Sequence, residues 1–357
     1  MKNTSCLTLT RLDTELSRSR CSFDLALPCL IPGLSGQKAE MGANWIHGID
    51  LNPIYKIAVE NNLLATHYSG RKLGQKIMFL TEDGEPVNAK IVEEVDWYFG
   101  MIMASCEDFY QSQIPTPYEN DSVGAYVERE FGDKFRKYRG RDLKLRQMIL
   151  QQRLLGESII SGCHLMNELA LSEVGSFKEL PGVHYVIPPG FESVVHILSH
   201  NIPKEKVLLD HAVSQIHWDS SVGGGNEAAA VCVECQNGKK IYADQVLVTV
   251  SLGYLKRHAG RLFSPPLPDV KLDAINRLEM GTVNKVVLEF DSQVLPDGVF
   301  RLEMIWNREN IENEDISESW VKKIGCYEAI ADNVLVGKSG VLFWTLYGLS
   351  LVINARG

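Results

Sequence analysis

The sequence predicts a protein of the α/β or α+β class in which two domains are interleaved. Its 357 residues are enough for two domains of ordinary size. Helical periodicity dominates from about 86 to 160, whereas short strand-like runs separated by glycine and proline dominate from about 183 onward. A helical block inserted early in a chain of mixed character therefore indicates two interleaved domains.

Capping residues predict where helices begin. Asn52 can cap a helix that has Pro53 at its first position, because proline suits a helix start and asparagine accepts from the free amides. Asp121-Ser122 can cap a second helix that continues through Glu130. Periodicity predicts further helices at 142–157, 191–201 and 269–278.

The strands are predicted by short runs rich in β-branched and aromatic residues. These runs lie at 183–187, 207–209, 213–218, 228–235, 240–242, 245–250 and 282–290. The glycines at 223–225 predict a hairpin loop, and Asn237-Gly238 predicts a tight turn. Residues 1–38 show no clear periodicity, so we expect this segment to be weakly structured.

The composition argues against several classes of protein. Lys+Arg is 36 and Asp+Glu is 45, so the net charge is −9. The chain therefore has no excess of basic residues for binding the phosphate backbone of a nucleic acid. No run of 18 apolar residues occurs, which predicts no membrane span. Eight cysteines in 357 residues are too few for a disulfide scaffold. Reduced thiols, with no terminal peroxisomal signal in Asn354-Ala355-Arg356-Gly357, predict a cytoplasmic protein and leave a peroxisomal one as the alternative.

Two short motifs are weak candidates. Cys232-Val233-Glu234-Cys235 is a CxxC in a predicted strand, and no second pair lies near it to complete a zinc site. We interpret these residues as buried thiols, and we predict no metal site. Gly337-Lys338-Ser339 resembles the end of a P-loop, but Asp332 stands where the motif needs its first glycine.

Two other stretches can carry chemistry. Gly42-Ala43-Asn44-Trp45-Ile46-His47-Gly48 combines small residues with a bulky apolar pair, which suits a backbone that passes close to a flat ligand. His47 can transfer a proton near neutral pH, although on composition alone it is more often an ordinary histidine in a turn before a helix. Lys285 shares one strand face with Glu289, opposite Val286, Leu288 and Phe290. It can be an ordinary exposed lysine or a partly buried one that holds a water molecule against a cofactor.

Taken together, several segments resemble the FAD-dependent polyamine oxidases, a family of flavin amine oxidases that includes the spermine oxidases. The segments that carry the resemblance are 40–48, 52–55, 179–182, 187–191, 213–218, 243–253 and 281–285. The resemblance implies a FAD cofactor in contact with Gly42, Ala43, Asn44, Trp45 and Val213. It also implies that His47 positions the substrate or relays protons, and that Lys285 holds a water near the flavin.

The implied reaction is the oxidation of a polyamine by molecular oxygen, with release of an aldehyde, an amine and hydrogen peroxide. The implied fold has an incomplete FAD-binding domain at 39–60 and 186–264, and a substrate domain of helices and antiparallel sheet at 61–185 and 265–336. Residues 1–38 and 337–357 depart from the family pattern. A histone demethylase, another flavin amine oxidase, is a weaker alternative, because such enzymes lack the Trp-Ile-His-Gly string.

Three departures favour a second interpretation. The family's GxGxxG loop, which holds the FAD diphosphate, is replaced by Gly33-Leu34-Ser35-Gly36. The family's C-terminal segment, with its aromatic residues, has no counterpart after Val336. In addition, Ile160 stands where the spermine oxidases have a substrate-binding acid, and the acid nearest to that position is Glu157. The alternative is an inactive, truncated or splice-variant fragment that binds no FAD and is poorly soluble.

Overall fold

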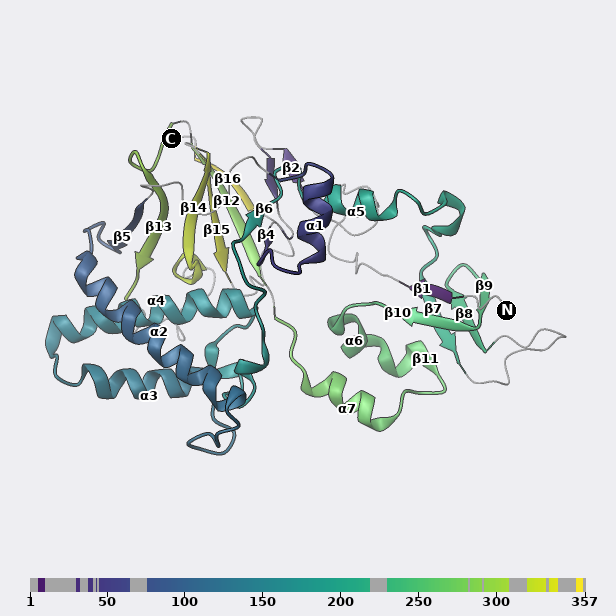
Figure 1. The fold of residues 1–357 in the computed structure, drawn as a ribbon, viewed down its shortest axis with the longest axis horizontal. Helices are drawn as coiled ribbons and strands as arrows, with labels where there is room; N and C mark the ends of the chain where they lie inside the picture. The colour runs from purple at the N-terminus through teal and green to yellow at the C-terminus, as the bar shows by residue number, and fades with distance from the viewer. Residues whose placement is uncertain are drawn as a thin grey trace. The chain divides into compact units, whose positions relative to one another are not determined.

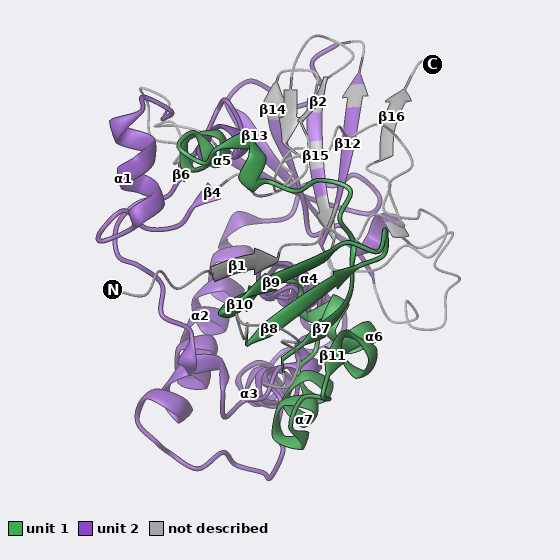
Figure 2. Cartoon of the chain, turned by 90° about the vertical axis from the view of Figure 1, so that its right-hand side faces the viewer, with its two compact units in different colours: residues 1–27, 195–280 green, residues 28–194, 281–357 purple. Residues whose placement is uncertain are grey.

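The computed structural model describes residues 6–9, 30–32, 38–40, 43, 45–64, 76–218, 230–281, 283–290, 292–307, 320–331, 334–339 and 351–355. The chain divides into two compact units, a smaller one of residues 1–27 with 195–280 and a larger one of residues 28–194 with 281–357 (Figure 2). This division groups residues 39–60 with 61–185, whereas the sequence analysis grouped them with 186–264. The domain boundaries given there stay a prediction.

Three helices form the core of the larger unit. They are α2 (Ala89–Gln111), α3 (Val123–Phe135) and α4 (Gly140–Ser161), and the short 3-10 helices η1 (Met166–Glu168) and η2 (Val174–Ser176) pack beside them. Their inward faces bury a common cluster that includes Val95, Val127, Phe135 and Ile149. Ser122 caps α3 by accepting from the amide of Ala125, as the sequence predicted.

One carboxylate ties these helices together. Glu94 of α2 accepts from Arg146 of α4, with Oε2 3.0 Å from Nε and 2.7 Å from a terminal guanidinium nitrogen. Its Oε1 accepts from the Tyr138 hydroxyl at 2.7 Å, and the Arg146 guanidinium lies 3.6 Å from the centre of the Tyr138 ring. Burial alone would raise the pKa of Glu94, but the hydrogen bonds from Tyr138 and Arg146 outweigh it and lower this pKa.

A six-stranded sheet completes the larger unit, and Figure 1 shows α2, α3 and α4 lying together below it. The strand order is β16-β12-β15-β14-β13-β5. Their bounds are β5 (Lys76–Thr81), β12 (Asn284–Phe290), β13 (Val299–Ile305), β14 (Cys326–Ala331), β15 (Val334–Ser339) and β16 (Leu351–Ala355). The 3-10 helix η5 (Trp320–Lys323) precedes β14. Arg153 of α4 pairs with Glu303 of β13, which fixes the helices to the sheet.

A small cluster of short elements lies in the same unit. Strands β4 (Trp45–Ile46) and β6 (Tyr185–Val186) pair in antiparallel fashion, and the helix α1 (Pro53–Glu60) belongs to the same cluster. Helix α5 (Glu192–Ser199) begins in this unit, which ends at Val194, and its remaining residues belong to the smaller unit. Ile46, Ala58, Ile187 and Val194 form the buried core of this cluster. Asn52 caps α1 as predicted, since its Oδ1 accepts from the amides of Ile54 and Tyr55.

The smaller unit is built on a four-stranded sheet of order β11-β7-β8-β9. Its strands are β7 (Val213–His217), β8 (Val231–Cys235), β9 (Lys240–Ala243) and β11 (Phe263–Ser264). Strand β10 (Gln245–Val248) pairs in parallel with β1 (Cys6–Leu9), and the helices are α6 (Leu252–Leu262), α7 (Asp269–Arg277) and the 3-10 turn η3 (Lys204–Lys206). Ile216, Val233, Tyr254 and Leu262 form the buried core of this unit.

Several local predictions are confirmed. The Asn237-Gly238 turn joins β8 to β9, with Gly238 at φ +81°. Cys232 and Cys235 are free and buried, so the interpretation of the CxxC as thiols in a strand is correct. Gly337-Lys338-Ser339 lies in β15 and is no phosphate loop. The loop predicted at 223–225 lies outside the described residues.

Other local predictions are wrong. Residues 207–209 form no strand, because the amides of Lys206 and Val207 bond back to Pro203 and Lys204 and close 3-10 turns instead. The strand expected at 183–187 is only Tyr185–Val186. Within the segment 1–38, expected to be weakly structured, the described residues form β1 and β2 (Leu30–Pro32), which pairs with β3 (Lys38–Glu40), and the rest of the segment lies outside the described residues.

Strand β16 pairs with β12, so the described residues of the C-terminal segment belong to the main sheet.

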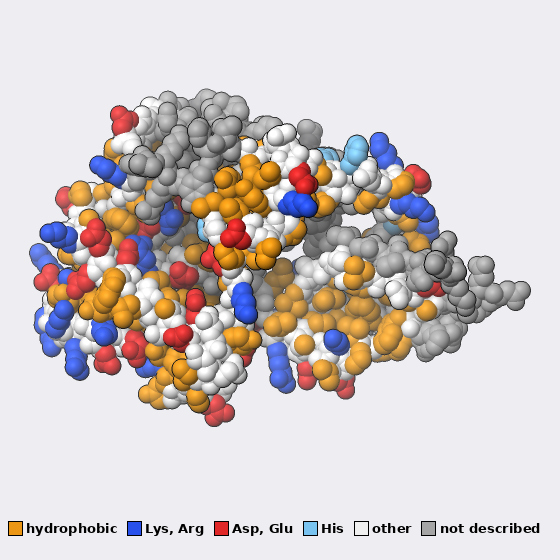
Figure 3. All heavy atoms as spheres, in the orientation of Figure 1, with side chains coloured by type: hydrophobic (Ala, Val, Ile, Leu, Met, Phe, Trp, Pro, Cys, Tyr) orange, Lys and Arg blue, Asp and Glu red, His pale blue; other side chains and the backbone are white. Residues whose placement is uncertain are grey.

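The surfaces of the helical block and of the smaller unit differ in the kinds of side chain that they expose. Figure 3 shows acidic and basic side chains scattered over the helical block and hydrophobic side chains gathered over the smaller unit. Val270 and Leu278 are among the large apolar side chains exposed there. Within the described ranges, none of the helices is both long and apolar enough to cross a membrane.

We predict that Glu94→Gln lowers the free energy of unfolding by about 2 kcal/mol at pH 7, because a charged acceptor is lost. The folded pKa of Glu94 lies below its ordinary value of 4.5, so its contribution is complete at neutral pH and is lost as the pH falls through that folded value. Urea unfolding at several pH values should therefore show the difference between the two proteins shrinking below about pH 4.5. The control is Glu93→Gln, because Glu93 is the exposed neighbour on the same helix. An equal loss of stability in Glu94→Gln and Glu93→Gln would contradict the stabilising role given to the Glu94 carboxylate.

Candidate active site

Two loops of the larger unit meet through their backbones and carry the candidate site. The pairing of β4 with β6 places Trp45 opposite Val186 and Ile46 opposite Tyr185. Beyond these strands, the amides of Ile49 and Asp50 both donate to the carbonyl of Pro181, at 3.0 and 3.1 Å. Loop 47–50 is therefore fixed against loop 179–184.

Gly48 makes this contact possible. It has φ +69°, and a Cβ atom there would lie 2.1 Å from the carbonyl oxygen of Leu180. Any other residue would have to force the two loops apart. The amide group of Asn52 also donates to the carbonyls of His47 and Gly48, both at 3.1 Å. The capping residue of α1 thus also orients the loop that carries His47.

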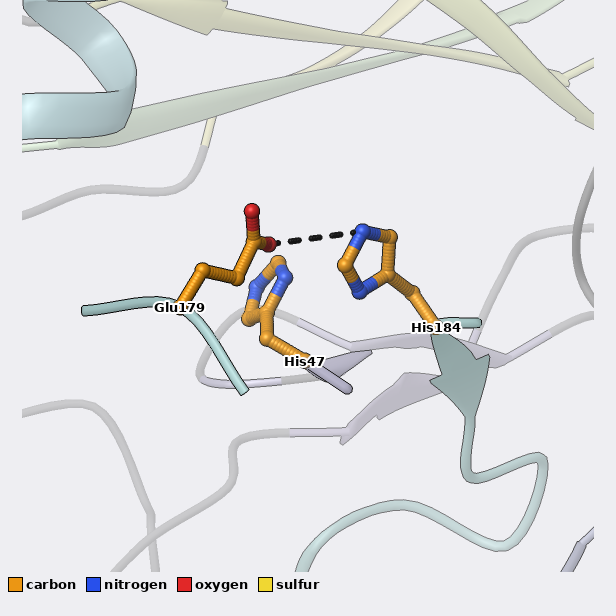
Figure 4. A group of neighbouring side chains, drawn as sticks. All are labelled: His47, Glu179 and His184. Atoms are coloured by element: carbon orange, nitrogen blue, oxygen red, sulfur yellow. Dashed lines mark ion pairs between the residues drawn. The ribbon is translucent and has the colours of Figure 1, made fainter. Parts of the chain in front are cut away.

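Three side chains converge where these loops meet (Figure 4). His47 and His184 have ring centres 5.0 Å apart, with their planes at 64°. Nε2 of His184 lies 3.4 Å from Oε1 of Glu179. His47 and Glu179 are exposed and His184 is half-buried, so the group is open to a ligand from solvent.

The backbone determines which nitrogen of His184 carries the proton. The amide of Gly48 donates to Nδ1 of His184 at 3.1 Å. A proton on Nδ1 would set two donors against each other, so the ring N–H is assigned to Nε2. That N–H faces the carboxylate of Glu179. The Glu179 carboxylate is thereby oriented while its second oxygen points away from His184 (Figure 4).

The same hydrogen bond argues against a metal ion at this cluster. The ligand atoms of His47, Glu179 and His184 lie within 4.8 Å of one another, a spacing that metal sites use. A histidine that binds metal through Nε2 donates through its Nδ1–H, however. At His184 this position faces the Gly48 amide, which is itself a donor. The geometry therefore argues against a metal ion bound through Nε2 of His184.

The residues predicted for the site lie in different places. Trp45 is half-buried, and its ring is stacked 6.4 Å from that of His47 at an angle of 26°. Ala43 is exposed, while Gly42 and Asn44 lie outside the described residues. Val213 lies on β7 in the smaller unit, whereas His47 belongs to the larger unit.

Lys285 lies on β12 of the six-stranded sheet, in the same unit as His47. Its neighbours Val286, Leu288 and Phe290 belong to a hydrophobic cluster on one face of the sheet, as the alternation predicted. Lys285 is half-buried on the other face rather than fully exposed. A half-buried lysine is compatible with the water-holding role that the resemblance implies.

Glu157 and Ile160 occupy the stretch of α4 where the resemblance expects an acid. Ile160 is 78% exposed. Glu157 is half-buried, and its burial, with a smaller effect of the charge of Glu107, raises the pKa of its carboxyl. An acid is therefore present on this helix, one turn before the position predicted for it.

Glu179 and His184 were missed as site residues by the sequence analysis. Both lie within or beside segments that carry the family resemblance, but neither belongs to a motif. The signal that could have found them is the pairing of 185–186 with 45–46, which brings the flanks of both strands together. Single-residue patterns do not contain that pairing.

Comparisons with known proteins show which family the chain belongs to. The model of the family described as flavin containing amine oxidoreductase matches residues 32–342. The chain belongs to this family, and its helices and sheets have the mixed fold class predicted for it. The resemblance to the polyamine oxidases within this family is also confirmed.

Three relatives illustrate the range of the family. The peroxisomal N(1)-acetyl-spermine/spermidine oxidase of Bos taurus is 29% identical over 310 residues, which are 81% of this chain and 59% of the relative. The probable polyamine oxidase 5 of Arabidopsis thaliana is 29% identical over 321 residues, which are 80% of this chain and 58% of the relative. The histone demethylase-like protein A of Aspergillus fumigatus is 40% identical over 114 residues, 32% of this chain and 10% of the relative. This chain thus spans about three-fifths of the polyamine oxidases that it matches.

We predict that Gly48→Ala destabilises the protein much more than Gly84→Ala. Both glycines have positive φ, at +69° and +80°, so both variants have a backbone strain of about 1 kcal/mol. Only at position 48 does the new Cβ also meet a carbonyl oxygen, because nothing lies within 4 Å of that atom at Gly84. Thermal unfolding of the two variants measures the difference. Equal melting temperatures would show that the two loops are not in contact.

Proposed function

We propose that this chain acts in the FAD-dependent oxidation of polyamines of the spermine and spermidine type, with release of hydrogen peroxide. The observation that carries the proposal is the group of His47, Glu179 and His184 in a member of the flavin containing amine oxidoreductase family. A carboxylate held beside two histidines suits a cationic amine, since the carboxylate attracts an ammonium and a histidine can accept its proton. The names of the bovine and Arabidopsis relatives support polyamines as the substrate class.

The described residues that the resemblance assigns to the cofactor suit a flat ligand. Ala43 is exposed and carries only a methyl group, so it leaves room beside its backbone. Trp45 provides a half-buried aromatic surface next to His47. When bound, FAD supplies the hydride acceptor for amine oxidation. Ala43 and Trp45 would help to hold it.

The protein's own residues prepare the amine. Glu179 binds an ammonium group of the polyamine, because its carboxylate is exposed and is oriented by the Nε2–H of His184. His47 accepts the proton that the reacting nitrogen must lose before its carbon can be oxidised. Asn52 keeps His47 in place through the two carbonyls of its loop. Lys285 holds a water molecule, as the resemblance implies.

We predict that the chain retains a visible flavin spectrum when it is expressed with excess FAD and then desalted. Peroxide release should follow with spermine, spermidine or their acetylated forms, and His47→Ala should lower kcat by about 100-fold, because a proton acceptor is lost. Lys285→Met tests the water-holding role in the same assay. A colourless protein would contradict the proposal and favour the inactive fragment. Activity on a methylated lysine peptide in place of polyamines would point to the histone demethylase branch.

A second prediction concerns Glu179. In the flavin-loaded chain, Glu179→Gln should raise KM for spermine about tenfold with a smaller change in kcat, since one charge-assisted contact is lost from substrate binding. Glu173→Gln is the matched control, because Glu173 is an exposed glutamate six positions earlier in the sequence whose side chain accepts from Ser172. Steady-state peroxide kinetics measure both variants. An unchanged KM in Glu179→Gln would exclude this carboxylate from substrate binding.

A further inference from the structure

The loop between α2 and α3, residues 112–122, contains no residue of the proposed reaction. Its central residues form neither helix nor strand, and two of them are Pro115 and Pro117. Each proline has a fixed φ, and a residue that precedes a proline favours extended backbone. All residues of the loop up to position 120 are exposed except Thr116, which is half-buried. The α2–α3 loop therefore offers an extended segment to solvent.

Tyr118 is the most exposed of the described tyrosines. It is 62% exposed, and within the described part of the chain no hydrogen bond engages its hydroxyl. The exposed carboxylate of Glu119 follows it directly. Tyr242 is exposed to a similar extent, 55%, but it lies in β9, where its backbone belongs to a sheet. Unlike Tyr242, Tyr118 can therefore enter the cleft of another enzyme without the loss of regular structure.

Hydrogen bonds at both ends hold the α2–α3 loop in place. At its start, the amide of Ile114 donates to a carbonyl in the last turn of α2 at 3.0 Å. At its end, the carbonyl of Asp121 accepts from the amide of Leu171 at 3.0 Å. Between these points, the Thr116 hydroxyl donates to the carbonyl of Tyr118 at 2.9 Å. Tyr118 is therefore held at a defined place although it is exposed.

A guanidinium of α3 lies beside the exposed ring. The Cζ atom of Arg129 is 4.8 Å from the centre of the Tyr118 ring. Both terminal nitrogens of Arg129 donate to the carboxylate of Asp121, whose side chain is only 4% exposed. Because Asp121 is fixed, the guanidinium is held next to Tyr118. Two of its five N–H donors are used in this way, and three remain for a further anion.

We propose that Tyr118 is a phosphorylation site and that Arg129 binds the resulting phosphate. A tyrosine kinase transfers the γ-phosphoryl group of ATP to the Tyr118 oxygen, so that a new P–O bond forms as the bond to the β-phosphate breaks. ADP leaves, and the proton of the hydroxyl passes to the catalytic aspartate of the kinase. The exposed Glu119 supplies an acidic charge that a basic substrate groove can recognise. The proposal is independent of the polyamine reaction, since it uses no residue of the His47 group.

The phosphate changes the charge at the start of α3. It adds a charge of about −1.5 to −2 at neutral pH, together with three acceptor oxygens. The remaining donors of Arg129 bind these oxygens while its hydrogen bonds to Asp121 stay in place. Phosphorylation thus attaches the α2–α3 loop to α3 at one more point.

The first test uses the full chain, ATP and the catalytic domain of a tyrosine kinase of broad specificity, with each modified site measured by mass spectrometry. We expect Tyr118 to be phosphorylated at least about tenfold faster than Tyr242, because a residue in a strand must first unfold locally. Tyr118→Phe should remove the fast phase of phosphate incorporation. Equal rates at the two tyrosines, or no phosphate on Tyr118, would overturn the proposal.

The second test is a phosphorus-31 NMR titration of the phosphorylated chain. The second pKa of a phosphotyrosine is about 6, and a neighbouring guanidinium lowers this pKa because it favours the dianion. We expect a pKa of about 5 in the folded chain and of about 6 in a peptide of residues 113–120 phosphorylated on Tyr118. Arg129→Gln should return the pKa to that of the peptide. Arg136→Gln should not, because Arg136 is an exposed arginine at the other end of α3.

A conservative variant separates loss of phosphate binding from loss of the fold. Arg129→Lys keeps the positive charge, so it should retain part of the lowering of the phosphotyrosine pKa. Melting temperatures show which variants fold. The same pKa in the folded chain and in the peptide would overturn the proposal, because Arg129 would then not bind the phosphate. So would a lowered pKa that persists in a folded Arg129→Gln variant.

Discussion

The close approach of Gly48 to Leu180 is the constraint on which the candidate active site depends. These residues are more than 130 positions apart, and their contact leaves no room for a Cβ atom at position 48. The approach puts the Gly48 amide within reach of His184 and the carbonyl of Pro181 within reach of two further amides. If the loops separated, the Gly48 amide would lose its acceptor on His184, and His47 and Glu179 would no longer face each other. The positions of the three side chains therefore depend on how the backbones of the two loops pack.

The hydrogen bonds of the two loops explain how the side chains of His47, Glu179 and His184 can be well oriented although they are open to solvent. His47 is held from its backbone by Asn52, which at the same time caps α1. His184 is held at its ring by the Gly48 amide, and Glu179 is oriented by the N–H on the opposite side of that ring. No residue of the group needs to be buried for its geometry to be fixed, so the site can stay open to a long, flexible cation. This combination suits the polyamine chemistry that we propose for a member of the flavin containing amine oxidoreductase family.

Much of the local structure could be predicted because its causes are local. The caps at Asn52 and Ser122, the turn at Asn237-Gly238 and the alternation in β12 each depend on a few neighbouring residues. The family could be predicted because the Trp-Ile-His-Gly string and the Lys285 strand are distinctive together. The approach of Glu179 and His184 to His47 could not, because it depends on the pairing of β4 with β6. Residues 207–209 were mistaken for a strand because three apolar residues satisfy that pattern, while the preceding 3-10 turn takes the backbone elsewhere.

The most direct test of this account is the protonation state of His184. Nitrogen-15 NMR of the histidine-labelled chain, assigned with His184→Gln and His47→Gln, reports which ring nitrogen carries hydrogen. At neutral pH the account predicts a proton on Nε2 and a bare Nδ1 that accepts from Gly48. A proton on Nδ1, alone or together with Nε2, would contradict it, because the Gly48 amide could not then donate to His184. The loop contact that organises the site would be lost with that hydrogen bond.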